Sequence, residues 1–184
     1  SLFAGLLGVM PLAAFSIAFN VLALNFMFAL GLGSATAVCV GNAHGRGERR
    51  DMVYAGWTGL GLTVIAMSLL GIILLAFNVQ IAVGFTDNLD LVSRAAPLIG
   101  FIALVLIADG GQSVMAHALR GCSETWVPAA LHVIAYLFIM IPLAWYLSLP
   151  AGRGAIGLFE AILIASIVSL SLASIRFWII SRKN

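Results

Sequence analysis

Long apolar stretches separated by short polar segments run along the whole sequence. The first 45 residues contain no Asp, Glu, Lys or Arg. At about 1.5 Å per residue this stretch would form a helix of roughly 65 Å, about twice the thickness of the hydrocarbon core of a bilayer. It is therefore predicted to hold more than one span, with a break at Gly8 and Pro11, because proline removes a backbone donor and clashes with the preceding turn.

An N-terminal helix stub, residues 1–9, and five full membrane-spanning helices are predicted from this pattern. Because residues 1–9 are too few to cross a bilayer, the sequence is expected to begin inside a larger protein. Asp51 precedes the second apolar segment and Pro150 follows the fourth. The predicted spans cover residues 12–42, 53–78, 94–118, 126–148 and 155–180.

The composition favours a membrane protein over a soluble domain. Hydrophobic residues make up 62% of the chain, charged residues make up 9%, and the mean hydropathy is +1.13. Soluble domains carry about 25% charged residues. A chain in lipid must satisfy its backbone polar groups as helices or as a closed barrel. Barrel strands alternate apolar and polar residues, whereas these segments are apolar on all sides, so an all-α, polytopic transmembrane helix bundle is predicted.

The basic residues lie mostly in loops on one side of the predicted bundle. Seven of the nine Lys and Arg residues fall on that side, namely Arg46, Arg49, Arg50, Arg120, Arg176, Arg182 and Lys183. The positive-inside rule places this side, and with it the C-terminus, in the cytoplasm of a cell whose inner or plasma membrane the chain crosses. The net charge of +2 and the lack of a basic stripe argue against binding to nucleic acid.

Motifs of common enzymes and of metal sites are absent from the sequence. There is no phosphate-binding Gly-x4-Gly-Lys-Ser/Thr loop, no His-Glu-x-x-His and no Gly-x-Ser-x-Gly. Cys39 and Cys122 are far apart and lack the spacing of metal ligands. We therefore expect that the chain is not an enzyme, and that it has no catalytic residues, no metal site and no cofactor.

Asp109 is the ionisable residue that the pattern places near the middle of the membrane. It lies eleven residues before Arg120, about 16 Å along a helix. An ionisable side chain at that depth is costly, so it normally faces a cavity or a partner. Gln112, Ser113 and His117 follow at helical spacing and form a polar stripe on the same face. Asp109 and Gln112 are predicted to bind Na⁺ or H⁺; a structural Asp bonded to a neighbouring helix is the alternative.

Other polar side chains inside the spans are weaker candidates. Asn20 in the first span is a candidate cation ligand, although an intramembrane Asn usually makes an interhelical hydrogen bond. His132 and Tyr136 share a face of the fourth span, and His can titrate near neutrality. With Ser113 and His117 they are predicted to line a substrate cavity; hydrogen-bonded packing is the alternative for His132.

Two stretches resemble the C-terminal lobe of a transporter of the multidrug and toxic compound extrusion (MATE) family. The first is the Gly-rich segment 31–41, with Asn20 before it. The second is Asp109-Gly-Gly-Gln-Ser-Val-Met-Ala-His-Ala-Leu-Arg-Gly121, followed by Pro128. The resemblance covers essentially the whole chain, and the Asp-x-x-Gln…Leu-Arg-Gly pattern is its more specific part.

The resemblance implies a twelve-helix antiporter of two six-helix lobes that exports organic cations in exchange for Na⁺ or H⁺. Residues 1–184 would then be the C-terminal transmembrane lobe, from the end of helix seven to helix twelve, and would work with an N-terminal lobe. It also implies that Asp109 belongs to the coupling-cation site. The chain departs from the family pattern at Cys39, where Arg is usual, and at Val105, where a polar or aromatic residue is common.

The predicted function is therefore secondary active transport, in which Na⁺ or H⁺ drives the export of organic cations and other drugs across the cytoplasmic membrane. The expected partners are the lipid bilayer, the small organic cation and the missing N-terminal lobe. One alternative is a lipid-linked oligosaccharide flippase of the same superfamily, although no Lys or Arg lies deep in a span. The other is a non-transporting membrane scaffold.

Overall fold

The computed structural model describes residues 9–183 and places in them five helices that are long and apolar enough to cross a membrane. This confirms the predicted multi-span bundle, and the chain is a multi-pass membrane protein. The five candidate spans are Val9–Gly45, Arg49–Ala76, Leu89–Gly121, Trp126–Ser148 and Gly154–Arg182. The helix stub that was predicted for residues 1–9 lies outside the described residues, apart from Val9.

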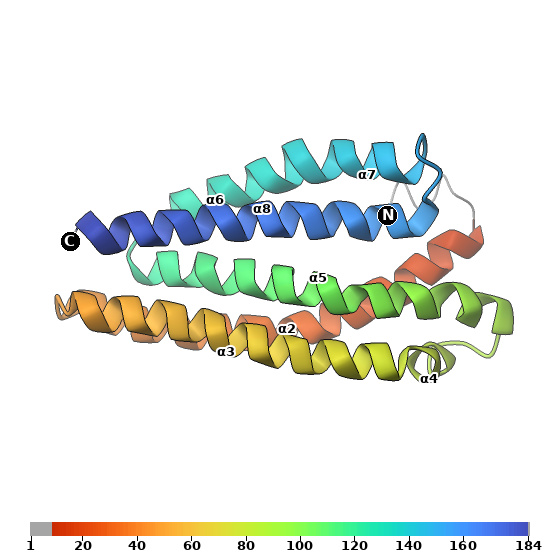
Figure 1. The fold of residues 1–184 in the computed structure, drawn as a ribbon, viewed down its shortest axis with the longest axis horizontal. Helices are drawn as coiled ribbons and strands as arrows, with labels where there is room; N and C mark the ends of the chain where they lie inside the picture. The colour runs from red at the N-terminus through yellow and green to blue at the C-terminus, as the bar shows by residue number, and fades with distance from the viewer. Residues whose placement is uncertain (1–8, 184) are drawn as a thin grey trace.

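The long helices lie side by side and connect at the two ends of the bundle (Figure 1). The turn from α2 to α3, the turn from α5 to α6 and the C-terminus share one end, and the short α4 lies at the other. The elements are α2 (Val9–Gly45), α3 (Arg49–Ala76), α4 (Asn78–Val83), α5 (Leu89–Gly121), α6 (Trp126–Val133), η1 (Ile134–Met140), α7 (Ile141–Ser148) and α8 (Gly154–Lys183).

Helix α5 is the central helix of the bundle. It runs between α2 and α3 on one side and α6, α7 and α8 on the other (Figure 1). More than half of its most apolar stretch is buried (56%), against 17% for the rod formed by α6, η1 and α7. Its fully buried side chains include Ile99, Ile102 and Leu106, which belong to the same core as Met67 of α3 and Phe159 of α8. Polar groups on α5 are therefore held inside the protein.

The start of the first span differs from the predicted one. Helix α2 contains Val9 and Pro11, whereas a break was predicted at Gly8 and Pro11. Pro11 is the third residue of α2 as described. Pro11 therefore lies within the described helix and does not end it.

The fourth span contains a π-helical segment, which was not predicted. Segment η1 joins α6 and α7 into one continuous rod (Figure 1). Pro142 follows the segment and has no N–H to donate to the carbonyl of Phe138, four residues earlier, against which its ring would also clash. A wider turn relieves that clash. π segments are rare and are found frequently at functional sites.

Small residues bring helices α2, α3 and α5 close together. A Cβ atom added to Gly59 of α3 would lie 2.2 Å from Oγ1 of Thr36 on α2. One added to Gly121, at the end of α5, would lie 2.7 Å from the carbonyl oxygen of Ala37. Such contacts are typical of membrane helices, where small residues let backbones approach. Glycine at these two positions is therefore required by the packing.

Candidate functional site

Asp109 is buried on the central helix α5. Its carboxylate accepts hydrogen bonds from side chains of α5 itself, of η1 and of α8. Its side chain is 9% exposed. Oδ1 accepts hydrogen bonds from Tyr136 Oη at 2.9 Å, Ser166 Oγ at 3.1 Å and Gln112 Nε2 at 3.1 Å. Oδ2 accepts none from the residues that the structure describes. One carboxylate oxygen is thus held in place while the other stays available to a ligand.

Gln112 extends the same network on the side of α5 that faces α6 and α8. Its Oε1 accepts a hydrogen bond from Ser169 Oγ at 2.9 Å, and Nδ1 of His132 lies 3.3 Å from that oxygen. When the Nδ1 of His132 carries the proton, it donates to Gln112. The amide nitrogen of Gln112 therefore donates to the carboxylate of Asp109, while its amide oxygen accepts hydrogen bonds from side chains of α6 and α8.

Helical spacing explains why these side chains converge. Ser166 and Ser169 lie three residues apart on α8, and His132 and Tyr136 lie four apart on the fourth span, so each pair shares a helix face. The rings of His132 and Tyr136 stack, with centroids 4.2 Å apart and planes inclined by 25°. Tyr136 lies in the π segment, so that irregular segment positions the phenol against Asp109.

The two glycines after Asp109 allow neighbouring helices to approach it. A Cβ added to Gly110 would lie 2.8 Å from Cγ of Met67 on α3, and one added to Gly111 would lie 3.2 Å from Leu170 on α8. The sequence Asp-Gly-Gly-Gln therefore places two polar side chains on one face of α5 and leaves room for packing on the others. This close packing keeps the carboxylate away from lipid.

A cavity of about 400 Å³, here called the Asp109 cavity, opens beside the carboxylate. Its polar lining comes from Asp109, Gln112, His132 and Tyr136. Its other wall is apolar and aromatic and comes mainly from α2; it includes Phe19, Leu22, Ala23 and Phe26. The cavity therefore offers one buried carboxylate, hydrogen-bonding groups and two aromatic rings to a ligand.

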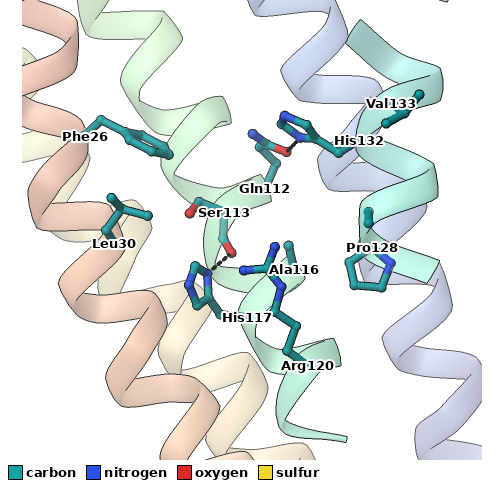
Figure 2. Close-up of a pocket in the computed structure, with 11 residues that line it drawn as sticks. Phe26, Leu30, Gln112, Ser113, Ala116, His117, Arg120, Pro128, His132 and Val133 are labelled. Carbon is teal, nitrogen blue, oxygen red and sulfur yellow. Dashed lines mark hydrogen bonds between the residues drawn. The ribbon is translucent and has the colours of Figure 1, made fainter. Parts of the chain in front are cut away.

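A second cavity of about 360 Å³, here called the His117 cavity, lies along α5 toward the end of the bundle that carries Arg120. Figure 2 shows its lining, with Phe26 and Leu30 of α2 facing the polar side chains of α5. His117 lies near the middle of it, and its Nδ1 is 2.8 Å from the carbonyl oxygen of Ser113. The two cavities share Phe26, Gln112 and His132.

Six of the seven residues that were predicted to form a site line these two cavities. They are Asp109, Gln112, Ser113, His117, His132 and Tyr136. The seventh, Asn20, is not brought to Asp109. It is exposed on α2 and lines neither cavity, although Phe19, its neighbour in sequence, lines the Asp109 cavity.

Two residues of the network were not predicted, namely Ser166 and Ser169 of α8. Both are buried and both donate to groups of α5. Their spacing by three residues in an apolar span is the one signal that the sequence contains. That signal is weak, because serine is also common wherever membrane helices pack.

The structure offers no evident site for a transition metal. Among residues 9–183, no three His, Cys, Asp or Glu side chains lie close enough together to hold a metal ion. Cys39 is exposed and Cys122 is buried, and both are free thiols. The polar groups around Asp109 are oxygen atoms, one amide nitrogen and an imidazole, a set that suits a proton or a hard cation such as Na⁺.

The sequence matches a known protein family and several named relatives. The model of the family described as MatE matches residues 1–146. A probable multidrug resistance protein NorM of Caulobacter vibrioides is 33% identical over 177 residues, which cover 96% of this chain and 38% of the relative. The multidrug resistance protein NorM of Burkholderia vietnamiensis is 40% identical over 161 residues, which cover 84% and 35%. The chain thus spans little more than a third of these relatives.

Solved structures share the fold at lower sequence identity. The crystal structure of the eukaryotic MATE transporter AtDTX14 superposes with a TM-score of 0.86 at 20% identity, over 95% of this chain and 38% of that one. The outward-facing conformation of a multidrug resistance MATE transporter of the MOP superfamily gives a TM-score of 0.86 at 16% identity, over 98% and 42%. The described helices therefore have the arrangement found in part of these transporters.

Proposed function

This chain belongs to the MatE family of membrane transporters, and we propose that it forms the C-terminal lobe of a Na⁺- or H⁺-coupled antiporter that exports organic cations. Its relatives include proteins named for multidrug resistance. The chain covers 38% of the first of these relatives, so the transport cycle requires parts of the protein beyond residues 1–184.

The bonding of Asp109 is the observation that carries this proposal. A buried carboxylate presents Oδ1 to three donors and lines a cavity of about 400 Å³. Burial of a lone charge in lipid is costly, and such residues usually serve a transport pathway. Binding of Na⁺ or H⁺ to Oδ2 would neutralise the charge without breaking the three hydrogen bonds.

The Asp109 cavity also suits an organic cation. Its aromatic rings, Phe19 and Phe26, can contact a cation through their faces, and its carboxylate provides the opposite charge. Ser113, His117, His132 and Tyr136 are the proposed polar contacts of the substrate. Because the inward ion and the outward substrate are both positive, they compete for the same carboxylate.

Competition for one carboxylate explains how the two fluxes are coupled. Each ligand lowers the affinity for the other by the same factor, as linkage requires. Uptake of Na⁺ or H⁺ at Asp109 therefore releases the substrate, and arrival of a new substrate releases the ion. Gln112 is the proposed second cation ligand. Asn20, on the exposed face of α2, remains a predicted ligand that only a rearrangement or a further part of the protein would bring to the site.

The orientation in the membrane is proposed from charge. The end of the bundle that holds the α2–α3 turn and the C-terminus carries six described arginines, namely Arg46, Arg49, Arg50, Arg120, Arg176 and Arg182. Arg94 and Arg153 are at the other end. The positive-inside rule places the arginine-rich end, and so the C-terminus, in the cytoplasm of a cell whose inner or plasma membrane the protein crosses.

The test is ethidium transport by the full-length protein in proteoliposomes under an imposed Na⁺ or H⁺ gradient. We expect Asp109→Asn to abolish gradient-driven transport while the protein still purifies as a monodisperse species. Asp90→Asn, the same change at an exposed position of the same helix, is the matched control and should transport normally. Normal transport by Asp109→Asn would refute the role of this carboxylate. Absence of transport by the unmodified protein under both gradients would favour the scaffold alternative.

A further inference from the structure

A groove of about 660 Å³ lies between α3 and α8 at the arginine-rich end of the bundle, away from both cavities of the transport site. Its lining residues include Arg49, Arg50 and Arg182 and the aromatic residues Tyr54, Trp57 and Trp178. We propose that this arginine–tryptophan groove binds the phosphate headgroup of an anionic phospholipid. The inference does not depend on the proposed transport function.

The arginines of the groove are arranged to leave donors free. Arg49 donates through Nε to the backbone carbonyl of Ser181, which fixes the start of α3 against the end of α8. The guanidinium of Arg182 lies over the ring of Trp178, 3.7 Å from its centroid, so the stack uses the face of the guanidinium and leaves its N–H edges open. Arg50 makes no side-chain hydrogen bond or ion pair with the residues that the structure describes.

The local charge of the groove is uncompensated. No acidic side chain lines it within residues 9–183. Glu48, just before α3, is paired with Arg46 at 2.6 Å, and that hydrogen bond lowers the pKa of Glu48 below its usual value, so its charge is already neutralised by a partner outside the groove. Asp51 lies in the first turn of α3 but does not line the groove. The groove therefore combines three arginines with a largely apolar, aromatic wall and no acidic lining residue.

The start of α3 adds to this positive character. Its N-cap residue, Glu48, makes no side-chain capping hydrogen bond. The positive end of the dipole of this 28-residue helix lies at the arginine-rich end of the bundle. Anions bind readily at such helix starts.

The depth of the side chains matches the layers of a membrane surface. Arg49 and Arg50 begin α3, whereas Trp57 lies two turns further in, about 10–12 Å along the helix. Trp178 lies about one turn before Arg182 on α8. Tryptophan and tyrosine concentrate at the level of lipid headgroups, and arginine lies beyond them at the phosphates. The arginines are therefore at the level of the lipid phosphates, and the tryptophans are one layer deeper, toward the acyl chains.

The surface beyond the groove favours a lipid over a free anion. Ile175 and Ile167 precede Trp178 on the same side of α8, further from the arginine-rich end, and both are exposed. An acyl chain can run along this apolar face while its phosphate lies among the arginines. Basic pockets between membrane helices on the cytoplasmic side are sites of this kind for anionic lipids.

The test measures the binding of phosphatidylglycerol to the full-length protein in a neutral detergent. The readouts are thermal stability against added lipid and native mass spectrometry of bound lipid. We expect the double variant Arg50→Gln/Arg182→Gln to lose at least about tenfold in apparent affinity, since each basic residue near a membrane surface contributes to anionic-lipid binding. The control Arg94→Gln/Arg153→Gln removes two arginines at the other end of the bundle and should bind as the unmodified protein does.

Two comparisons separate the sources of the anion. Phosphatidylcholine and inorganic phosphate at the same concentration should not reproduce the stabilisation. Stabilisation by inorganic phosphate alone would overturn the lipid assignment, and so would equal binding by the two double variants. If the groove variant does not fold, Arg182→Gln alone is used, because it changes one arginine of the groove instead of two. Undiminished binding by that single variant would also overturn the proposal.

Discussion

The phenol oxygen of Tyr136 lies 2.9 Å from Oδ1 of Asp109, and Ser166 Oγ lies 3.1 Å from both atoms. These three groups come from η1, α5 and α8. A change of charge at Asp109 therefore acts directly on three helices. This connection gives the carboxylate a physical means to bias the arrangement of the bundle when a cation binds or leaves.

Tyr136→Phe removes one donor from the empty, charged carboxylate. Hydrogen bonds to charged groups contribute about 1.5–3 kcal/mol, and water in the cavity replaces part of that. The empty state is then less stable relative to the cation-bound state, so the half-maximal cation concentration for transport should fall by about tenfold. Cation release, and with it the maximal rate, should slow. The measurement is ethidium efflux by the full-length protein across a series of Na⁺ and H⁺ concentrations.

Tyr146→Phe provides the matched control for that change. Tyr146 lies in the same span but is exposed and lines neither cavity. Its substitution should leave the cation dependence as it is. An unchanged cation dependence in Tyr136→Phe would show that the bond to Asp109 has no part in coupling.

Three of the five serines of α8, namely Ser166, Ser169 and Ser171, should differ in effect according to what they contact. Ser166→Ala removes a donor to Asp109 itself and should shift the cation dependence as Tyr136→Phe does. Ser169→Ala removes a donor to Gln112 and should have a smaller effect. Ser171 bonds to the carbonyl of Ile167 in its own helix, so Ser171→Ala should have none. The same transport assay ranks the three variants, and any other order would contradict the network described here.

The five spans could be predicted because the length and apolar composition of a segment identify a membrane helix. The limits of those helices were less predictable, as Pro11 shows: a break was predicted there because proline disrupts a helix interior, yet α2 contains this residue. The π segment was not predictable, because residues 134–140 read as ordinary apolar helix. A proline inside an apolar segment, such as Pro142, can produce either a kinked α-helix or a π segment, and the sequence does not distinguish the two.

The candidate site could be predicted only where one helix defines it. Asp109 stood out as an acid inside an apolar segment, and Gln112 followed from helical spacing. Ser166 and Ser169 lie 57 residues from their partners, and only the rotation of α8 against α5 brings them there. The rotation of a helix about its axis is set by side-chain packing. A segment that is apolar on all sides has no periodic pattern that shows which face is buried. The exposure of Asn20 depends on the rotation of α2 for the same reason.

Gly59→Ala should destabilise the bundle. The new Cβ would lie 2.2 Å from Oγ1 of Thr36, so α2 and α3 would have to separate. Overpacking of this kind costs about 1–3 kcal/mol. The expected result is a clearly lower melting temperature in detergent, measured by the loss of monodisperse protein on heating. Gly61→Ala is the control, since nothing lies within 4 Å of its Cβ position; equal melting temperatures for the two variants would contradict the tight contact.

Cys122 should be inert toward maleimide in the folded protein. Burial raises the pKa of its thiol to about 11, and the thiolate is the reactive form. Below that pH the thiol stays protonated, so labelling at pH 7.5 should be slow and should accelerate as the pH rises toward 11. The measurement uses mass spectrometry of a Cys39→Ala background, with denatured protein as the positive control. Labelling of the folded protein as fast as the denatured one would show that Cys122 is accessible.

The π segment determines which face of α7 is turned toward α8. A π turn holds one residue more than an α turn, because its hydrogen bonds join residues five apart instead of four. One extra residue corresponds to about 100° of rotation in an α-helix. The part of the span after Met140 therefore turns a different face toward α8 than an uninterrupted helix would, with Ala144 and Ser148 inward. Deleting a single residue from 134–140 would leave the span long enough to cross the bilayer and yet swing α7 by more than a quarter turn.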